Sequence, residues 1–492
     1  MNFLGLRITD HDTNVSYSTD NKIRYLKSER LHQVKHHGYR DFWAAFSDTQ
    51  HWNISDLQAI AISADATNVP FSVDEEKNFQ LAPDWFLKEF NCPIYIIEHH
   101  LAHALSCWPV KKTEFDFHIV ADGFGDYHRC LTIFDKEFNV VERRDLTTHE
   151  SFGLMLGKFS KNIMNIKGHE LDLCGKAMGL QSYGQVNYEI FDEYSKLDDL
   201  RPLRNSNIWN ASLDMQTKID YLATLHKIME NTMLNLFKKY FQPHHHISYS
   251  GGVAQNTVIN RTLKLNFPNM EIPPHCADDG LSLGCVEFLR KIYNQNEFST
   301  EAFPYWQDDD IGENVSQETI QDAAKELSEG KIVAWFQGAG EIGPRALGNR
   351  SILLDPRIVN GKEIINDTVK HREWYRPFGA TVLKDRSKEF FSETHDNPYM
   401  LYVVGVKKKI FPSITHVDES CRTQTIERGS NHYAKLIEEF EKLTNVPILL
   451  NTSLNVNGKP IASKKEDAME LFYNSKIDVL YLGNKKIVRM GQ

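Results

Sequence analysis

The sequence has no run of apolar residues close to the roughly 18 that a membrane-spanning helix needs. Residues 1–9 also lack the basic stretch followed by a long apolar segment that marks a secretory leader. We therefore expect a first β-strand at the start of the chain, no membrane partner, and a cytoplasmic protein.

The chain also lacks an excess of basic residues and any closely paired cysteines. Lys and Arg number 56 against 66 Asp and Glu, which gives a net charge of −10. A nucleic-acid-binding surface normally needs the opposite imbalance, so we expect no nucleic-acid partner, although a local basic pocket for phosphate is compatible with this charge. Seven scattered cysteines, none in a CxxC pair, favour free thiols over a disulfide framework or a structural zinc site.

Short apolar runs alternate with amphipathic stretches along most of the 492 residues. Residues 1–27 alternate as a β-hairpin does, and residues 219–240 predict a long amphipathic helix. The sequence thus predicts an α/β fold, and it shows no internal repeat. Four later apolar runs are typical of buried strands: 59–62, 94–97, 118–121 and 246–249.

A polar, acidic and non-periodic stretch interrupts this pattern near residue 300. We take residues 301–317 as a linker between one domain over 1–300 and a second over 318–492. The second domain begins with a predicted helix at 316–329 and a strand at 332–336, and it ends with strands near 447–450 and 479–482.

His99 and His103 are candidate metal ligands because residues four apart share one face of the helix that we expect there. Asp122 follows the next predicted strand, and Asp278 is a second carboxylate at a predicted strand end. Two His and two Asp would suit Fe²⁺, Zn²⁺ or Mn²⁺. The alternative is that the histidines are surface or capping residues. The tract 244–246 ranks lower, since it leads straight into a strand as solvated loop residues would.

Two glycine turns follow predicted strands, at 122–126 and 249–256. Glycine lets backbone amides approach phosphate oxygens, and a helix N-terminus favours anions. A tight hairpin needs glycine as well, so each turn alone leaves both interpretations open. Neither has the spacing of a P-loop or of a dinucleotide fingerprint. The candidate nucleotide-contacting residues are Gly123, Gly125, Ser250, Gly251, Gly252 and Asn256.

The second domain gathers cationic residues beside glycine, proline and aromatic residues. GPRALGNRS (343–351) contains two arginines, VKHREWYRPFG (369–379) adds Lys370, Arg372 and Arg376, and LNTSLN (450–455) supplies amide and hydroxyl groups after a strand. A cationic pocket in an acidic protein suits a small phosphate or a nucleoside triphosphate. The alternative is a solvated surface, the commoner setting of any single arginine. The candidate binding residues are Arg345, Lys370, Arg376, Arg422, Asn451 and Ser453.

Together these motifs resemble the O-carbamoyltransferases of the nodulation protein U and cephalosporin carbamoyltransferase type, including the tobramycin enzyme. Matches run in family order over nearly the whole chain, and GPRALGNRSIL (343–353) and NTSLN (451–455) are long and specific. The other matching stretches are His11-Asp12, Glu29-Arg30, Lys35-His36, 99–104, Asp122-Gly123, 176–180, 250–256, 278–280, 369–378, 416–418 and Arg422.

The resemblance implies a mixed α/β and α+β protein with two domains. The N-terminal one would be an actin-like (ASKHA) metal and nucleotide domain, similar to that of the tRNA threonylcarbamoyl transferases, and the C-terminal one would be YrdC-like. In the family, the C-terminal domain makes carbamoyl adenylate from carbamoyl phosphate and ATP, which binds with Mg²⁺. The carbamoyl group then passes to an acceptor hydroxyl of a small molecule or a glycan, at the metal of the N-terminal domain.

The resemblance also implies roles for the candidate residues. His11 lies at the family's His-Asp pair near the acceptor and is the candidate general base. The metal implied is Fe²⁺, with Mn²⁺ or Zn²⁺ as the other options. Its implied ligands are His99, His103, Asp122 and Asp278. Lys370, Arg376 and Arg422 match carbamoyl-phosphate positions, with Asn451 and Ser453 beside them, and Lys370 and Arg376 would be catalytic. The two glycine turns match the nucleotide turns of the actin-like domain.

The chain departs from the family pattern at three places. Members commonly continue His-Asp with Ala-Ser where this chain has Thr13-Asn14, and their Gly-Arg before GPRALG is Gly338-Ala339 here. The usual Phe-Ala-Pro is Phe-Gly-Ala at 378–380. These changes bear on the acceptor and on the adenylation pocket more than on the reaction class.

Two other functions fit similar domains. One is a tRNA threonylcarbamoylation enzyme, against which the net negative charge argues. The other is a non-catalytic, metal- and nucleotide-binding regulator, against which the retained Lys370, Arg376 and Arg422 and the NTSLN motif argue. For the oligomeric state, a homodimer is the default expectation.

Overall fold

The computed structural model of the chain describes residues 1–19, 21–64, 72–310 and 314–489. The chain divides into two compact units. The N-terminal unit contains Met1–His32 and His36–Trp306, and the C-terminal unit contains Gln33–Lys35 and Gln307–Gln492. The division after Trp306 falls within the segment that we took as a linker, of which 311–313 lie outside the described residues.

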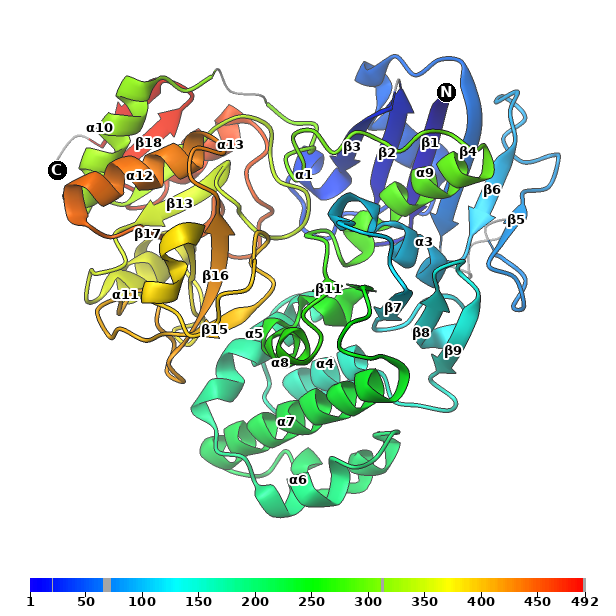
Figure 1. Cartoon of the computed structure of the whole chain (residues 1–492), viewed down its shortest axis with the longest axis horizontal. Helices are drawn as coiled ribbons and strands as arrows, with labels where there is room; N and C mark the ends of the chain where they lie inside the picture. Colours follow the sequence, from blue (N-terminus) through cyan, green and yellow to red (C-terminus); the bar gives the residue numbers. More distant parts are fainter. Residues whose placement is uncertain (20, 65–71, 311–313, 490–492) are drawn as a thin grey trace. The chain divides into compact units, whose positions relative to one another are not determined.

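The N-terminal unit begins with an antiparallel meander of three strands, β1 (Asn2–Ile8), β2 (Asn14–Thr19) and β3 (Lys22–Lys27), which confirms the expected hairpin (Figure 1). β1 also pairs in parallel with β4 (Leu57–Ala64), and the sheet continues through β6 (Ile94–Ile97) to the edge strand β5 (Phe79–Leu81).

Strand β1 is buried on both faces of its sheet. Leu4 packs into one core, and Phe3 packs into another beneath helix α9 (Leu281–Ile292). Gly5 permits this close approach, because a Cβ at that position would collide with the backbone carbonyl of Ser282 in α9.

A second sheet of the same unit repeats this strand pattern. β7 (Phe117–Ala121), β8 (Arg129–Asp135) and β9 (Val140–Asp145) form an antiparallel meander, and β7 pairs in parallel with β10 (Ile247–Ser250), which pairs in parallel with β11 (Met270–Glu271). The sheet orders β3-β2-β1-β4-β6 and β9-β8-β7-β10-β11 therefore correspond. We expected no internal repeat from the sequence, and for the topology this expectation is wrong. The two sheets share a strand-pairing pattern although their sequences are not similar enough to show it. The duplicated pattern agrees with the actin-like architecture that the resemblance implies.

Helices occupy the segments between and after these strands. The long helix predicted over 219–240 is confirmed as α7 (Met215–Tyr240), which begins earlier because the carboxylate of Asp214 caps it by accepting from the Thr217 amide. The other α-helices described in this unit are α1 (Ser28–His32), α2 (Phe42–Ser47), α3 (His99–Leu105), α4 (Phe152–Asn162), α5 (Glu170–Leu180), α6 (Tyr188–Tyr194) and α8 (Thr257–Asn266).

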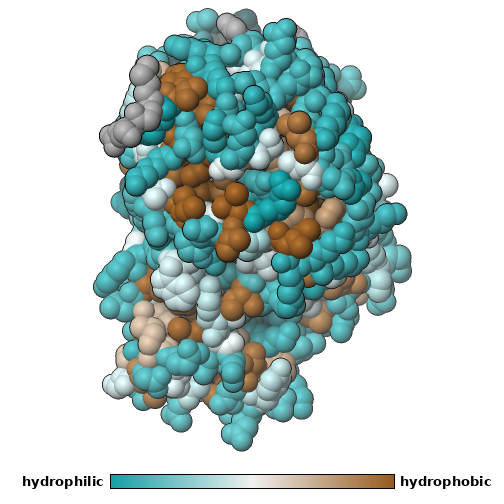
Figure 2. All heavy atoms as spheres, turned by 90° about the vertical axis from the view of Figure 1, so that its left-hand side faces the viewer, coloured by the Kyte–Doolittle hydropathy of each residue, from teal (hydrophilic) through white to brown (hydrophobic). Residues whose placement is uncertain are grey.

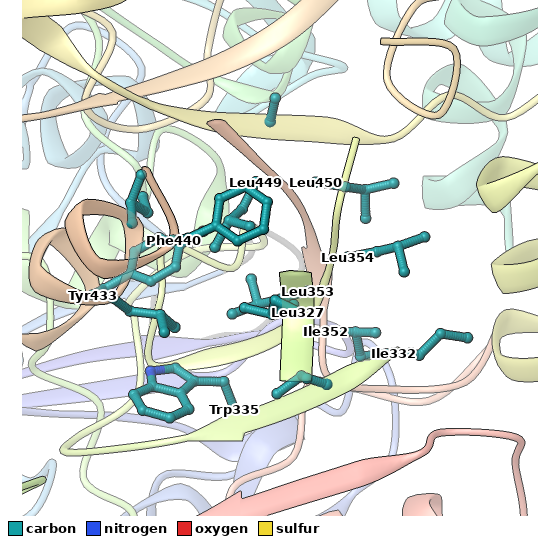
Figure 3. Packing of buried hydrophobic residues seen from close by; sticks show 14 of the residues in the cluster. Leu327, Ile332, Trp335, Ile352, Leu353, Leu354, Tyr433, Phe440, Leu449 and Leu450 are labelled. Carbon is teal, nitrogen blue, oxygen red and sulfur yellow. The ribbon is translucent and has the colours of Figure 1, made fainter. Parts of the chain in front are cut away.

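The C-terminal unit is α+β, with helices around one mixed sheet. In sheet order its strands are β15 (Val403–Gly405), β16 (Ser420–Ile426), β14 (Gly379–Leu383), β17 (Ile448–Ser453), β13 (Arg350–Leu354), β12 (Val333–Phe336), β18 (Val479–Leu482) and β19 (Lys485–Val488). Its helices are α10 (Gln317–Ser328), α11 (Gly361–Ile365), α12 (His432–Thr444) and α13 (Lys465–Tyr473). Figure 3 shows its core, in which Trp335, Leu353 and Leu449 of the sheet pack with Tyr433 and Phe440 of α12.

Two local predictions that matter for the site are wrong. Asp278 does not end a strand; it begins a 3₁₀ turn, Asp278–Gly280, that leads into α9. Asn451 and Ser453 do not follow a strand but belong to β17, which continues because these residues pair with Leu353 and Ser351 of β13.

None of the described helices is both long enough and apolar enough to cross a membrane. Figure 2 shows one face, on which hydrophilic side chains predominate and apolar ones form scattered patches. All seven cysteines are free, as predicted, and five of them are buried.

Candidate functional site

The structure brings the four predicted metal ligands together in the N-terminal unit. His99 and His103 lie on one face of α3, Asp122 directly follows β7, and Asp278 precedes α9. One ligand atom of each lies within 4.8 Å of those of the others, and all four residues are buried. The Nε2 atoms of His99 and His103 are 3.1 Å apart. Nε2 of His99 is 3.0 Å from Oδ2 of Asp122, and Nε2 of His103 is 3.3 Å from Oδ1 of Asp278.

The charges of this cluster fit a divalent cation. Burial disfavours a charged imidazole, but hydrogen bonds with Asp122 and Asp278 outweigh it and raise the pKa of His103 to about 9. Burial also opposes the charge of Asp122, whose hydrogen bonds with His103 and His99 nevertheless hold the pKa of that carboxyl well below its ordinary value. Two buried carboxylates thus require a positive charge, and a metal ion would supply it in place of the proton on His103.

Arg7 is a member of this site that the sequence analysis missed. It is 2% exposed, and its Nη2 donates to Oδ2 of Asp278 over 3.1 Å. Its Nε and Nη1 make no hydrogen bond within the described residues. The available signal was an arginine inside the apolar strand β1, because a buried guanidinium needs an anionic partner.

The carboxylate of Asp122 also joins the two glycine turns. Its Oδ1 accepts from the amides of Gly123 at 2.8 Å and Gly252 at 2.9 Å, while its Oδ2 faces the histidines. Gly251 has a φ of +90°, and a Cβ there would collide with the carbonyl of Ala121. Glycine is therefore required for the second turn to pack against the end of β7.

The remaining residues of the turns also make contacts within the protein. The amide of Gly125 donates to Arg129 and that of Gly251 to Cys276. The hydroxyl of Ser250 donates to the carbonyl of His103, and Asn256 caps α8. The turns thus pack around the metal ligands, and their contact with a nucleotide stays a prediction.

His11 lies beside a carboxylate, as a general base needs. Its Nδ1 is 3.2 Å from Oδ2 of Asp12. Burial alone would lower the pKa of His11, but the hydrogen bond with Asp12 and the charge of Asp278 raise it. A carboxylate that holds Nδ1 leaves Nε2 to exchange a proton with a substrate. Asp12 is itself held by Lys27 and His36, each 3.2 Å away.

Asp12, Glu29 and His36 form a second group that has the donor atoms for a metal ion. Here the Lys27 ammonium, 3.2 Å from both Asp12 and Glu29, already supplies the positive charge. We interpret this group as a buried ion network. The tract 244–246 belongs to neither metal-type group among the described residues, in agreement with its lower rank.

The C-terminal unit contains a cationic cluster, by which we mean Arg345, Lys370, Arg372, Arg376 and Arg422. Lys370 ends a π-helical turn and is 3% exposed, and the others are partly buried. Arg376 is 3.7 Å from Glu373, whereas the described residues place no carboxylate within 4 Å of Lys370, Arg372 or Arg422. Nζ of Lys370 donates to the carbonyl of Ser453 at 2.7 Å and to Oδ1 of Asn455 at 2.6 Å.

These cations destabilise one another. Burial, with the charges of Arg372 and Arg376, lowers the pKa of Lys370 well below its ordinary value. Burial, with the charges of Arg345 and Arg372, lowers the pKa of Arg422 in the same way. A bound anion would relieve this repulsion, so the cluster fits a small phosphate-bearing ligand.

Arg372 belongs to this cluster although it was not among the candidate binding residues. Its Nε donates to Asn366 at 2.7 Å, and its guanidinium lies 4.4 Å from the ring centroid of Phe378. The signal was its position two residues after Lys370 in a segment rich in aromatic residues.

We expect Lys370 to make the unfolding free energy of the ligand-free protein rise with pH. A lysine whose pKa is lowered on folding binds fewer protons when folded, so stability increases from its folded pKa up to the ordinary value of about 10.4. Lys370→Met should flatten this rise, while Lys362→Met, at a lysine paired with Glu363, should not. Denaturant unfolding at several pH values in phosphate-free buffer checks this, and equal slopes for wild type and Lys370→Met would contradict it.

The Gly338-Ala339 departure leaves its turn well fixed. Nη1 of Arg350 donates to the carbonyl of Gly338 at 2.9 Å, and Nδ2 of Asn349 donates to that of Ala339 at 2.7 Å. Asn349 in turn is 3.0 Å from His432. Ala339 in place of the family's arginine thus removes a cation, while the backbone of Gly338 and Ala339 stays hydrogen-bonded.

Both units match models of one family. Residues 4–286 match the model described as Carbamoyltransferase N-terminus, and residues 324–489 match that described as Carbamoyltransferase C-terminus. Nodulation protein NolNO of Sinorhizobium fredii is 29% identical over 476 residues, covering 87% of this chain and 69% of that protein. Nodulation protein NolO of Bradyrhizobium diazoefficiens is 31% identical over 440 residues, covering 79% and 78%. Among solved structures, T. kodakarensis HypF matches with 12% identity over 60% of this chain and 48% of its own, at a TM-score of 0.37.

Proposed function

Because the chain belongs to the carbamoyltransferase family, we propose that it is an ATP-dependent O-carbamoyltransferase that uses carbamoyl phosphate. Carbamoyl transfer is the activity of the family. The observation that carries the finer proposal is the cationic cluster, whose Lys370, Arg372 and Arg422 have no carboxylate partner within the described residues. Such a cluster suits two phosphate-bearing substrates better than a neutral one.

In the first half-reaction, carbamoyl phosphate and ATP give carbamoyl adenylate in the C-terminal unit. Water first hydrolyses carbamoyl phosphate to carbamate and phosphate. A carbamate oxygen then attacks the α-phosphorus of ATP, and the bond to the leaving pyrophosphate breaks. Lys370, Arg376 and Arg422 would neutralise the charge that builds up on the phosphates, with Arg345 beside them.

In the second half-reaction, an acceptor hydroxyl attacks the carbamoyl carbon in the N-terminal unit. The new carbon–oxygen bond replaces the bond to adenylate, and AMP leaves. The hydroxyl proton passes to Nε2 of His11, which Asp12 holds through Nδ1. His99, His103, Asp122 and Asp278 would hold a divalent cation, Fe²⁺ in our proposal, which when bound would supply a Lewis acid. The charge of Asp278, one of these ligands, also acts on His11.

The test is carbamoyl-phosphate-dependent release of pyrophosphate from ATP. We expect the purified protein with Mg²⁺ to release pyrophosphate only when carbamoyl phosphate is present, and to catalyse pyrophosphate–ATP exchange under the same conditions. Neither reaction needs the acceptor. Mass spectrometry should detect carbamoyl adenylate in the same tube. ATP cleavage to ADP and phosphate, or pyrophosphate release without carbamoyl phosphate, would contradict the proposed mechanism.

A further inference from the structure

The segment 346–350 of the C-terminal unit is held by a single buried carboxylate. Glu341 is fully buried. Its Oε1 accepts from three backbone amides, those of Leu347 at 2.7 Å, Asn349 at 2.8 Å and Arg350 at 3.2 Å. Three amide donors on one carboxylate oxygen form a strong, directional group of charge-assisted hydrogen bonds.

The carbonyl groups of the same segment are held from the sheet. Nε2 of Gln424 in β16 donates to the carbonyl of Leu347 at 3.0 Å, and Nδ2 of Asn451 in β17 donates to that of Ala346 at 3.2 Å. Asn451 is fully buried and also donates to Thr381 at 3.1 Å. Its amide nitrogen is therefore engaged with the backbone of 346–350, so it is not available to carbamoyl phosphate in this arrangement.

Gly348 closes the segment against a helix. Its φ is +116°, and a Cβ there would collide with the ring of Tyr433 in α12. Three amides, two carbonyls and the glycine of this segment are thus constrained, although the segment has no regular secondary structure before β13.

We propose that Glu341, Gln424 and Asn451 form a clamp that fixes the backbone of 346–350 and thereby holds Arg345 in the cationic cluster. Arg345 directly precedes the clamped segment, and its charge acts on Arg422. These three are positioning residues, because their polar groups bond the loop backbone. This assigns Asn451 to the loop, in place of the binding role that the family resemblance implies.

The clamped segment leads directly into a group of like charges around Arg422. Arg422 is already surrounded by the charges of Arg345, Arg372 and Arg376. Fixing the backbone beforehand lowers the cost of bringing Arg345 to the phosphate, which is preorganisation of the binding site.

Hydrogen exchange tests the clamp itself. In Glu341→Ala we expect the amides of Leu347, Asn349 and Arg350 to exchange about tenfold faster or more. Glu341→Gln keeps an acceptor oxygen but loses the charge, so these amides should exchange at a rate between those of wild type and Glu341→Ala. It tests the clamp if the alanine variant does not fold, and exchange equal to that of wild type would then overturn it. Glu326→Ala, at a buried carboxylate of α10 bonded to Lys331 and Lys486, is the control and should leave these amides unchanged. Unchanged exchange in Glu341→Ala would overturn the clamp.

Kinetics test the link to Arg345, and this arm rests on the proposed function. We expect Glu341→Ala to raise KM for carbamoyl phosphate about tenfold with a smaller effect on kcat, and to have no added effect in an Arg345→Ala background. Additive effects of the two changes, or an unchanged KM despite faster exchange, would overturn the positioning role. If the wild type releases no pyrophosphate, the proposed function fails separately. The dissociation constant of inorganic phosphate then replaces KM, measured for wild type, Glu341→Ala, Arg345→Ala and the double variant. Additive effects, or an unchanged dissociation constant in Glu341→Ala, would again overturn the positioning role.

Discussion

Replacing His103 with alanine will abolish high-affinity metal binding and stop carbamoyl transfer while leaving pyrophosphate release intact. His103 contributes one of the two nitrogen donors, and its Nε2 lies 3.4 Å from Asp122 and 3.3 Å from Asp278. Without it, two buried carboxylates face a single imidazole. We expect the metal dissociation constant to rise about 100-fold or more and the transfer rate to fall by a similar factor. Metal analysis and titration measure the dissociation constant. The rate of carbamate-ester formation on a hydroxyl compound that the wild type carbamoylates measures the transfer.

Helix α3 itself offers the matched control for this variant. His100 is fully buried next to His99, but its Nδ1 bonds Thr132 at 2.8 Å and it is not among the four clustered ligands. Burial lowers the pKa of His100 to about 3, so it is neutral at pH 7. His100→Asn should cost stability and leave metal content unchanged. Equal metal loss in both variants would mean that α3 has unfolded, and full metal retention in His103→Ala would contradict the site.

The parts of the fold that the sequence predicted are those with local signals. The hairpin over 1–27 alternates every second residue, and α7 has a continuous apolar face with Asp214 as its cap. The pair His99 and His103 needed only the helical period to be placed on one face. Nothing local indicates that β10 returns to pair with β7, because that contact joins residues about 130 positions apart.

The features of the site that could not be predicted depend on the same long-range pairing. Arg7 and Asp278 are 271 positions apart in the sequence. An isolated arginine in a strand does not indicate which carboxylate it will contact. Asn451 has an amide that suits a phosphate as well as a carbonyl. Only the pairing of β17 with β13 and β14 directs it to Ala346 and Thr381. Spacing supplied most of the candidate residues, whereas topology decided what each one contacts.

Replacing Lys370 with alanine will reduce carbamoyl-phosphate-dependent pyrophosphate release about 100-fold or more, the usual cost of losing one preorganised charge at a developing anion. Lys362→Ala, at a lysine 3.9 Å from Glu363, should keep wild-type activity. Lys370→Arg should not restore the rate, because a planar fork cannot meet the acceptors that Nζ reaches on Ser453 and Asn455.

A fall in activity of Lys370→Ala would have two possible explanations, and one further measurement separates them. Its Nζ bonds the carbonyls of Ser453 and Asn455, so the alanine variant removes a support of that loop as well as a charge. Methylammonium can enter the space left by the truncated side chain and supply the missing cation. If the lysine acts on the phosphates, added methylammonium should raise the rate of Lys370→Ala in proportion to its concentration, while equal concentrations of tetramethylammonium should not. A variant that keeps its pyrophosphate release without any amine would show that adenylation does not use this cation.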